Sequence, residues 1–262
     1  NMHMWCNISW CILIHYHGTP ITPDTCAIKA LKGRHAFISH AHQGQLKLAS
    51  EYCQSFAVDN GAFTVWKKSG VNKINWNEYY NFINEWKNHP RFDFCIIPDV
   101  IAGGEKENDD LLKEWELGAC GVPVWHMNES DERFIRLCNE YERVAIGSCG
   151  EYDVTSPKKC VAKLKDVIRH VLDKNNYPVT KLHGLRMLNH QIFTQIPLST
   201  ADSTNVARNI GIDKKWKGTY QPQSKETRAQ ILVERIEHYN SPSKLEYDKV
   251  ADKLLMQYEL EI

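Results

Sequence analysis

The sequence predicts an α/β protein, and the expected fold is a (β/α)8 barrel. Its 262 residues suit one barrel domain, which takes about 250 residues. Short apolar runs alternate with segments of helical periodicity, and this alternation is typical of a parallel sheet. There are eight such runs, whereas a doubly wound open sheet, which is the alternative, usually has fewer strands.

A polar residue or a glycine follows each apolar run within two residues. In chain order the expected strands cover residues 11–16, 36–39, 56–58, 94–97, 122–125, 144–146, 181–185 and 197–200. Active sites of barrels lie at the C-terminal ends of the strands. Most of the residues that follow these runs carry chemistry, which favours an enzyme; they are His17, His40, Asp59, Asp99, His126, Gly147 and Asp202.

Helical patterns fill most gaps between the expected strands. One apolar stripe recurs at helical spacing from Trp76 to Trp86. Ser156 followed by Pro157 indicates a helix start, because proline suits the first helical position. The expected helices are 43–53, 76–87, 105–116, 130–141, 157–174, 225–239 and 244–260.

Composition limits the partners and the compartment. Basic and acidic residues number 32 each, so no overall field attracts nucleic acid and such contacts need a local patch. Nine cysteines form no Cys-x-x-Cys pair, which argues against a disulfide framework and a zinc ribbon and favours a cytoplasmic protein. The apolar stretch 5–14 is too short to span a membrane. Residues 1–10 are expected to be an extension, with 11–262 forming one barrel and its C-terminal helices.

One chemistry that fits the strand ends is that of a zinc-dependent amidohydrolase-type barrel. His15 and His17 lie on the same side of the first strand, because side chains alternate along a strand. Later histidines (His126, His183) and Asp202 would supply further ligands. His-x-His also arises by chance in a chain with 12 histidines, so a hydrogen-bonded strand residue is the preferred interpretation of His15.

A second chemistry uses paired carboxylates and needs neither metal nor cofactor. Asp59, Asp99 and Asp202 follow the third, fourth and eighth runs and would converge at one barrel mouth. An acid that ends a buried strand must be hydrogen-bonded or used. Facing carboxylates suit cleavage of a glycosidic bond, since one stabilises or captures the sugar carbon and the other moves a proton.

Four segments in order resemble the tRNA-guanine transglycosylase superfamily. They are Val58-Asp59-Asn60-Gly61-Ala62-Phe63, Ile97-Pro98-Asp99-Val100, Ile146-Gly147-Ser148-Cys149-Gly150-Glu151, and Ala201-Asp202 with Ala207-Arg208-Asn209. The resemblance covers roughly residues 12–210. Members of that family are barrels that exchange a base in nucleic acid through a covalent sugar–enzyme intermediate, so the resemblance implies the same fold and reaction class.

The resemblance also implies catalytic roles. Asp202 matches the nucleophilic aspartate of the family, and Asp59 matches the aspartate that transfers a proton at the base site. Arg208 matches the arginine near the nucleophile that meets backbone phosphate.

For the base, Asp99 matches the aspartate that reads the base edge, and Gly147 and Ser148 match the Gly-rich loop whose backbone contacts the base. Asn60 and His126 are further candidates for base contacts.

The chain departs from the family in ways that bear on the substrate. Asn60 and Ala62 replace a serine and a glycine, and the segment after Asp202 is shortened. The family's cysteine-rich zinc insert is missing, because no cysteine follows Cys160. Since that subdomain helps to grip tRNA, its absence favours the short phage- and prophage-associated DpdA-like relatives, which insert 7-deazaguanine bases into DNA.

A local basic segment follows Asp202. It holds Arg208, Lys214, Lys215 and Lys217, and the rings of Trp216 and Tyr220 are interleaved with these cations. Cations for phosphates and rings for an unstacked base suit DNA that is single-stranded, or double-stranded with a flipped base. A solvated loop before a helix has the same composition.

The sequence leaves the outcome of the reaction open. Attack by a new base would make the enzyme a transglycosylase with a free base as second substrate. Attack by water would make it a DNA glycosylase that leaves an abasic site, and such an enzyme aimed at a modified phage base would act in defence. Besides the zinc amidohydrolase with His15 and His17, a non-catalytic barrel that binds nucleic acid is the remaining alternative.

Overall fold

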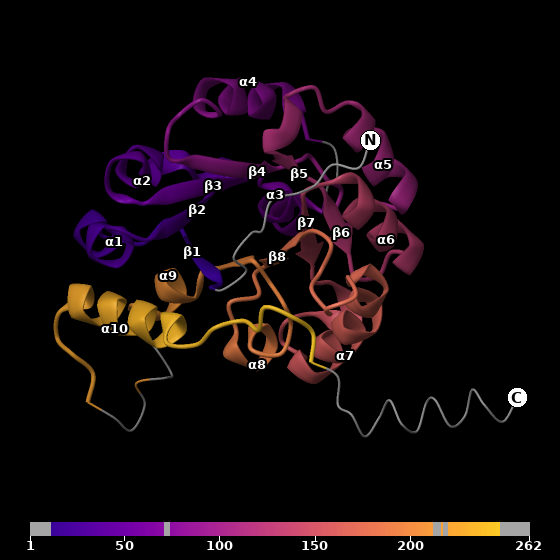
Figure 1. The fold of residues 1–262 in the computed structure, drawn as a ribbon. Helices are drawn as coiled ribbons and strands as arrows, with labels where there is room; N and C mark the ends of the chain where they lie inside the picture. Colours follow the sequence, from indigo (N-terminus) through magenta and orange to yellow (C-terminus); the bar gives the residue numbers. More distant parts are fainter. Residues whose placement is uncertain (1–11, 71–73, 212–215, 217–219, 247–262) are drawn as a thin grey trace, which may run out of the picture.

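A computed structural model describes residues 12–70, 74–211, 216 and 220–246. Within them, nine strands form one all-parallel sheet in the order β5-β4-β3-β2-β1-β9-β8-β7-β6, and Figure 1 shows helices around these strands. The strands are β1 (Ile14–Gly18), β2 (His35–Ser39), β3 (Ser55–Asp59), β4 (Phe92–Ile96), β5 (Gly121–Val122), β6 (Val124–His126), β7 (Arg143–Gly147), β8 (Lys181–Leu185) and β9 (Thr200–Ser203).

The sheet is nearly closed into a barrel. Its two edge strands, β5 and β6, are consecutive in the chain and only Pro123 separates them. Proline has no N–H to donate to a strand ladder, and here β5 pairs with β4 whereas β6 pairs with β7. The sequence predicted a single strand over 122–125, and Pro123 is the physical reason for the two strands observed.

Helices follow the strands around the ring. The α-helices are α1 (Asp24–Leu31), α2 (Leu46–Tyr52), α3 (Ala62–Ser69), α4 (Trp76–Trp86), α5 (Glu105–Lys113), α6 (Asp131–Glu140), α7 (Pro157–Ile168), α8 (His190–Phe193), α9 (Asn205–Asn209) and α10 (Lys225–Glu237). Short 3-10 helices are η1 (His40–Gln45), η2 (Gly118–Cys120), η3 (Gly150–Tyr152) and η4 (Arg169–Val171).

Several boundaries differ from the sequence prediction. Helices α1, α3, α8 and α9 were not predicted; α8 and α9 have four and five residues, too few to show a helical period. The helix expected over 157–174 ends at Ile168 and continues as η4. The last strand lies at Thr200–Ser203 instead of 197–200, so Asp202 is within the strand. The helix expected over 244–260 lies almost wholly outside the described residues.

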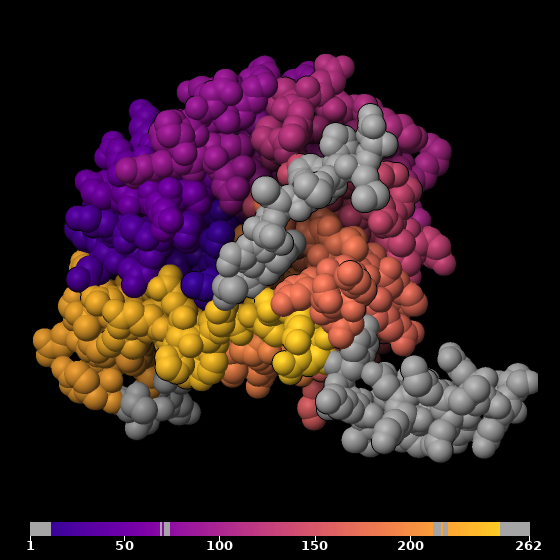
Figure 2. Space-filling view, in the orientation of Figure 1, coloured from indigo at the N-terminus to yellow at the C-terminus, as the bar shows by residue number. Residues whose placement is uncertain are grey.

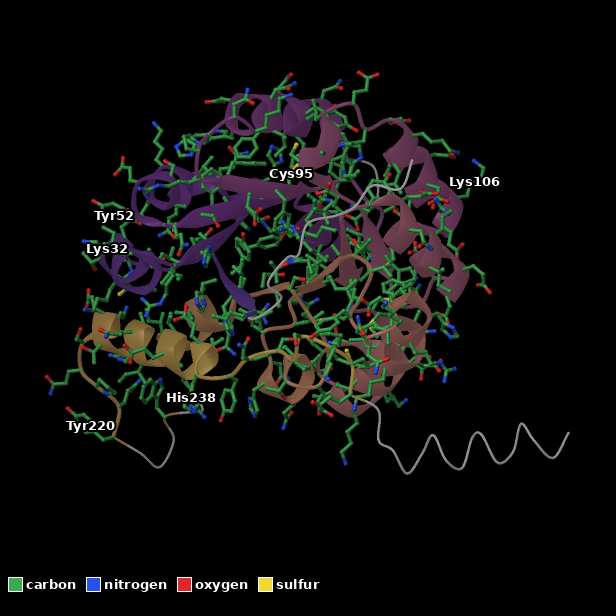
Figure 3. All side chains as sticks on the ribbon, viewed as in Figure 1. Lys32, Tyr52, Cys95, Lys106, Tyr220 and His238 are labelled. Atoms are coloured by element: carbon green, nitrogen blue, oxygen red, sulfur yellow. The ribbon has the colours of Figure 1, made fainter. Side chains whose placement is uncertain are left out.

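The interior of the barrel is a packed core. Inward-facing side chains of alternate strand positions fill it, among them Tyr16, Phe37, Phe94 and Val124, as expected for a small barrel. Two further apolar clusters lie between the sheet and the helices. Figure 3 shows this division, with Cys95 inside the molecule and Lys32 and Lys106 at its periphery.

Helix α10 packs against α1, beside β1 and next to the start of the described chain, as Figure 2 shows. Thr25 Oγ1 donates to Glu226 Oε1 at 2.7 Å. Glu237 lies 3.0 Å from His17 Nε2 and accepts from Arg34 Nε at 2.8 Å. These contacts attach α10 to α1, to β1 and to the residue that precedes β2.

Two expectations about the class of protein are addressed by the described residues. None of their helices has the length and apolar character required to cross a membrane. The cysteines among the described residues are free thiols.

Candidate functional site

The C-terminal ends of the strands place several polar side chains at one mouth of the barrel. In the register, Ser39 of β2 lies opposite Asp59 of β3, and Tyr16 of β1 lies opposite Asp202 of β9. Asp99 follows β4 by three residues. The three carboxylates interact, because the charges of both Asp202 and Asp99 act on Asp59. Asp99 and Asp202 therefore lie near enough to Asp59 for their charges to act on it.

Asp59 ends β3 and has a strongly altered acidity. Its Oδ2 accepts hydrogen bonds from Ser39 Oγ and from the N–H of Gly61, each at 3.1 Å. Burial, together with the charges of Asp202 and Asp99, raises the pKa of Asp59 from 3.8 to about 7. A carboxyl group with that pKa is partly protonated at neutral pH and suits proton transfer.

Gly61 sets the turn between β3 and α3. Its φ is +84°, in the left-handed region that glycine adopts without strain. A Cβ at this position would lie 3.1 Å from the backbone nitrogen of Ala41. The Asp-Asn-Gly turn thus directs the backbone N–H of Gly61 back to the Asp59 carboxylate.

Asp99 is buried and held on both oxygens. Its Oδ1 accepts from Asn60 Nδ2 at 2.6 Å, and its Oδ2 lies 2.8 Å from His126 Nε2. Asn60 also donates to Ile97 O at 2.9 Å and accepts from Ala62 N at 2.9 Å. Asn60 is therefore engaged within the protein, where it fixes Asp99 and the first turn of α3.

His126 connects Asp99 to a second buried network. Burial lowers the pKa of His126, but the hydrogen bond and charge of Asp99 and the charge of Glu129 outweigh it, so the pKa is raised overall. The Glu129 carboxylate accepts from the His126 backbone N–H at 2.8 Å and from Arg133 Nη1 at 2.7 Å. The backbone of His126 is thus tied through Glu129 to Arg133 of α6, while its imidazole lies against Asp99.

Gly147 makes room for this histidine. It lies next to His126 in the β6–β7 ladder, and a Cβ at this position would lie 2.8 Å from His126 Nδ1. Ser148 follows, and its buried Oγ has no hydrogen-bond partner among the described residues.

Asp202 points into the barrel from β9. Its side chain is buried, and Oδ1 accepts from the N–H of Arg186 at 2.8 Å and lies 3.5 Å from His183 Nε2. His183 is completely buried, and its Nδ1 lies 2.8 Å from Thr200 Oγ1. Burial lowers the pKa of His183 more than Asp202 raises it, so this imidazole is neutral at physiological pH. Its Nε2 lies beside the Asp202 carboxylate.

Arg186 joins the two sides of the mouth. It follows β8 with a φ of +61°, and its guanidinium carbon lies 4.5 Å from the ring centroid of Phe63 on α3. Sequence reasoning did not select Arg186, Phe63 or Ser39, and it named His183 only as a further zinc ligand. The available signal was position, because Arg186 directly follows an apolar run and Phe63 lies four residues after Asp59.

The remaining candidates lie elsewhere. Arg208 is exposed on α9, near the end of β9, whereas Lys214, Lys215 and Lys217 lie outside the described residues.

His15 and His17 share one side of β1 as predicted, but it is the outer side, where His15 Nε2 lies 3.1 Å from Tyr239 O and His17 meets Glu237. His40 packs on the rings of Tyr79 and Phe82. Across the described residues, no three potential metal ligands are grouped.

No protein-family model matches this sequence, and no curated protein does. The arrangement itself is chemically specific. Three acids interact at one mouth, one of them has a pKa near neutrality, and another is fixed between an asparagine and a histidine. This set can move a proton and stabilise positive charge on a substrate atom.

Proposed function

We propose that this protein cleaves the N-glycosidic bond between a base and its sugar in DNA. The observation that carries the proposal is the altered acidity of Asp59, which arises from burial and from the charges of Asp202 and Asp99. Glycosidic bond cleavage by paired acids requires one carboxyl group that gives and takes a proton near neutral pH, and Asp59 is such a group. The order of the motifs, which resembles that of tRNA-guanine transglycosylases, supports the same assignment.

In the proposed reaction, Asp202 is the nucleophile. A carboxylate oxygen of Asp202 forms a bond to the sugar C1′ while the bond from C1′ to the base nitrogen breaks, and the base leaves with that electron pair. Asp59, which is partly protonated at neutral pH, gives its proton to the departing base. The Arg186 N–H that binds Asp202 Oδ1 at 2.8 Å orients the carboxylate for this attack.

The second half of the reaction reverses the proton movement. An incoming nucleophile loses a proton to Asp59 and attacks C1′, which releases Asp202. A base as nucleophile gives exchange, and water gives an abasic site. Asp99 recognises the base edge, and its rigid attachment to Asn60 and His126 supports that role because a fixed acceptor discriminates between bases.

The proposed fold is a (β/α)8 barrel without a zinc subdomain. Strands β5 and β6 then count as one strand that Pro123 interrupts, which makes eight strands of the nine described. This is the barrel plan of the family that the motifs resemble, and the missing zinc insert favours DNA over tRNA.

The proposal is tested by incubating the protein with modified and unmodified phage DNAs. Mass spectrometry identifies released bases, and an aldehyde-reactive probe detects abasic sites. We expect base release by the wild-type protein and none by Asp202→Ala or Asp59→Ala, with circular dichroism showing that both variants fold. Activity retained in both variants would reject the proposal.

The same samples separate the alternatives. A zinc amidohydrolase would contain stoichiometric zinc by elemental analysis and would lose activity with a chelator. A non-catalytic barrel would bind DNA after loss of all three aspartates and release no base from any DNA.

A further inference from the structure

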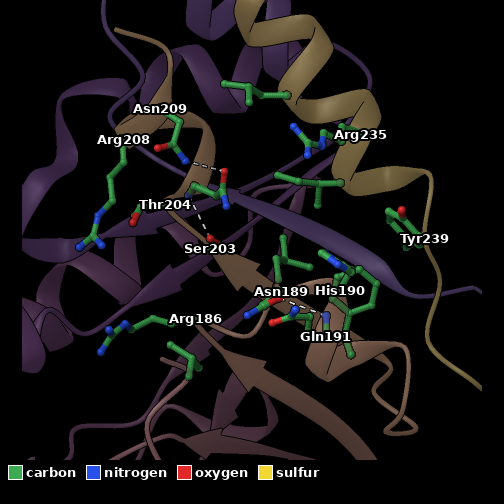
Figure 4. Close-up of a pocket in the computed structure, with 16 residues that line it drawn as sticks. Arg186, Asn189, His190, Gln191, Ser203, Thr204, Arg208, Asn209, Arg235 and Tyr239 are labelled. Carbon is green, nitrogen blue, oxygen red and sulfur yellow. Dashed lines mark hydrogen bonds between the residues drawn. The ribbon is translucent and has the colours of Figure 1, made fainter. Parts of the chain in front are cut away.

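An open cleft of about 640 Å³ lies outside the barrel mouth, beside the end of β9. The loop after β8, helix α8, helix α9 and helix α10 form its walls (Figure 4). Helix α8 has only four residues, so it leaves a gap next to α10 that a longer helix would fill.

The walls of this cleft carry positive charge. Three arginines line it, namely Arg186, Arg208 and Arg235, and no aspartate or glutamate is among the described residues that do. No described residue forms a hydrogen bond or ion pair with the guanidinium of Arg208 or Arg235, and the carboxylate recorded with Arg186 is Asp153, at 3.9 Å. Unpaired guanidinium groups around a concave surface attract anions, and phosphate above all.

The cleft also presents an aromatic surface. The ring of Tyr239 stacks on the imidazole of His190, with centroids 5.1 Å apart and an interplanar angle of 21°. Tyr239 is 42% exposed. Figure 4 shows this pair near the α10 wall of the cleft, whereas Arg208 and Arg186 lie on the other side. A ring face beside unpaired cations suits a nucleotide, because the base stacks and the phosphate pairs with arginine.

The cleft and the barrel mouth share a wall. Ser203 and Thr204, which line the cleft, directly follow Asp202. The backbone N–H of Arg186 binds the Asp202 carboxylate, while the Arg186 side chain borders the cleft. The mouth and the cleft therefore lie next to each other at the C-terminal end of β9.

From these observations we infer that the cleft between α8 and α10 binds a nucleotide of a single strand of nucleic acid, adjacent to the nucleotide that enters the mouth. Arg235 pairs with its phosphate, and Tyr239 on His190 stacks with its base. This inference rests on the function proposed above and extends the substrate contacts beyond the mouth.

The test measures binding of a fluorescein-labelled single-stranded oligodeoxynucleotide of about eight nucleotides by fluorescence anisotropy over a range of salt concentrations. We expect Tyr239→Ala to weaken binding about tenfold through loss of stacking. We expect Arg235→Gln to weaken it several-fold and to lower the salt slope by about 0.7, because one phosphate contact is lost.

Matched variants separate these effects from general damage. Tyr239→Phe keeps the ring and is expected to bind like the wild type. Lys47→Gln removes one exposed positive charge from α2, away from the cleft, and is expected to leave the affinity unchanged.

Unchanged affinity and salt slope in both Tyr239→Ala and Arg235→Gln would overturn the inference. Full competition by deoxyadenosine monophosphate at an equal concentration of nucleotide would also overturn it, since the site would then take a free nucleotide. Binding requires no chemistry, so variant-sensitive binding without base release from any DNA would refute the proposed function and leave this inference standing. Base release that is insensitive to both cleft variants would overturn the inference about the cleft and leave the proposed function standing.

Discussion

The two sides of the barrel mouth hold their carboxylates in different ways. Beside β3, β4 and β6, Asp99 is fixed by Asn60 and His126, and the network continues through Glu129 to Arg133. Beside β8 and β9, Asp202 receives one backbone N–H at 2.8 Å and has a histidine at 3.5 Å.

This difference indicates a division of work. A dense buried network has one geometry and suits recognition of a planar base. A carboxylate with few partners keeps the lone pairs that a nucleophile needs, and the unpaired arginines nearby suit the sugar–phosphate part of the substrate. Asp59 lies between the two sides and responds to the charges of both.

The largest expected effect comes from removing the nucleophile on the β9 side. Asp202→Asn keeps the acceptor for the Arg186 N–H but cannot form the sugar bond, so we expect single-turnover base release to fall at least about a thousandfold. DNA affinity, measured by anisotropy, should change little. Base release within tenfold of the wild type would show that the two sides do not divide as proposed.

The next effect concerns Asp59 and pH. Its folded-state pKa is raised from 3.8 to about 7, so the folded protein keeps a proton that the unfolded chain releases between these values. The stability of the wild type therefore falls as pH rises from about 4 to about 7.

Asp59→Asn removes this dependence while its amide oxygen still accepts from Ser39 or Gly61. We expect the variant to be more stable than the wild type by up to about 4 kcal/mol at pH 8 and by little near pH 4. Urea unfolding at a series of pH values measures the difference. An equal difference at both pH values would mean that Asp59 is ionised at neutral pH in the folded protein. Wild-type base release should also decline above about pH 7, because the proton donor is lost.

A smaller effect is expected from crowding the recognition side. In Gly147→Ala the new Cβ would lie 2.8 Å from His126 Nδ1, so the imidazole must shift from its present position against Asp99. We expect base release to fall about ten- to a hundredfold. Gly44→Ala is the control, because a Cβ there meets no atom within 4 Å. Equal activity of the two variants would show that the position of His126 is unimportant.

The smallest effect is expected from Arg208→Gln on the phosphate side. Loss of one phosphate contact should weaken DNA binding several-fold for all sequences alike and lower the salt slope by about 0.7 for a single strand. Anisotropy titrations with two unrelated oligonucleotides check this. Weakening confined to one sequence would assign Arg208 to base recognition instead.

Much of the fold was accessible from local sequence. The α/β class and the parallel barrel are confirmed, since apolar runs such as 144–146 and 181–185 lie within observed strands. Local signals did not predict the division of residues 121–126 into β5 and β6 at Pro123. That division follows from strand pairing, because β5 pairs with β4 and β6 pairs with β7. Local signals were also insufficient for α8 and α9, whose few residues carry no periodicity.

The candidate site was accessible in part. Asp59, Asp99 and Asp202 were found because each follows an apolar run. Arg186 was missed, and His183 was considered only as a zinc ligand, because their contacts with Asp202 join residues that are 16 and 19 positions apart in the chain. His15 and His17 show the converse: alternation placed them on one side of β1, but only the closed sheet shows that this side faces α10.

The sequence by itself determined the order of strands and helices and the approximate place of most strands, because apolar character and turn chemistry depend on neighbours along the chain. Tertiary structure alone decided which strand ends meet, how strongly Asp202 and Asp99 act on Asp59, and that a cleft opens beside the mouth. The physical reason is range: burial and charge interactions depend on distances in space, and closure of the sheet sets those distances.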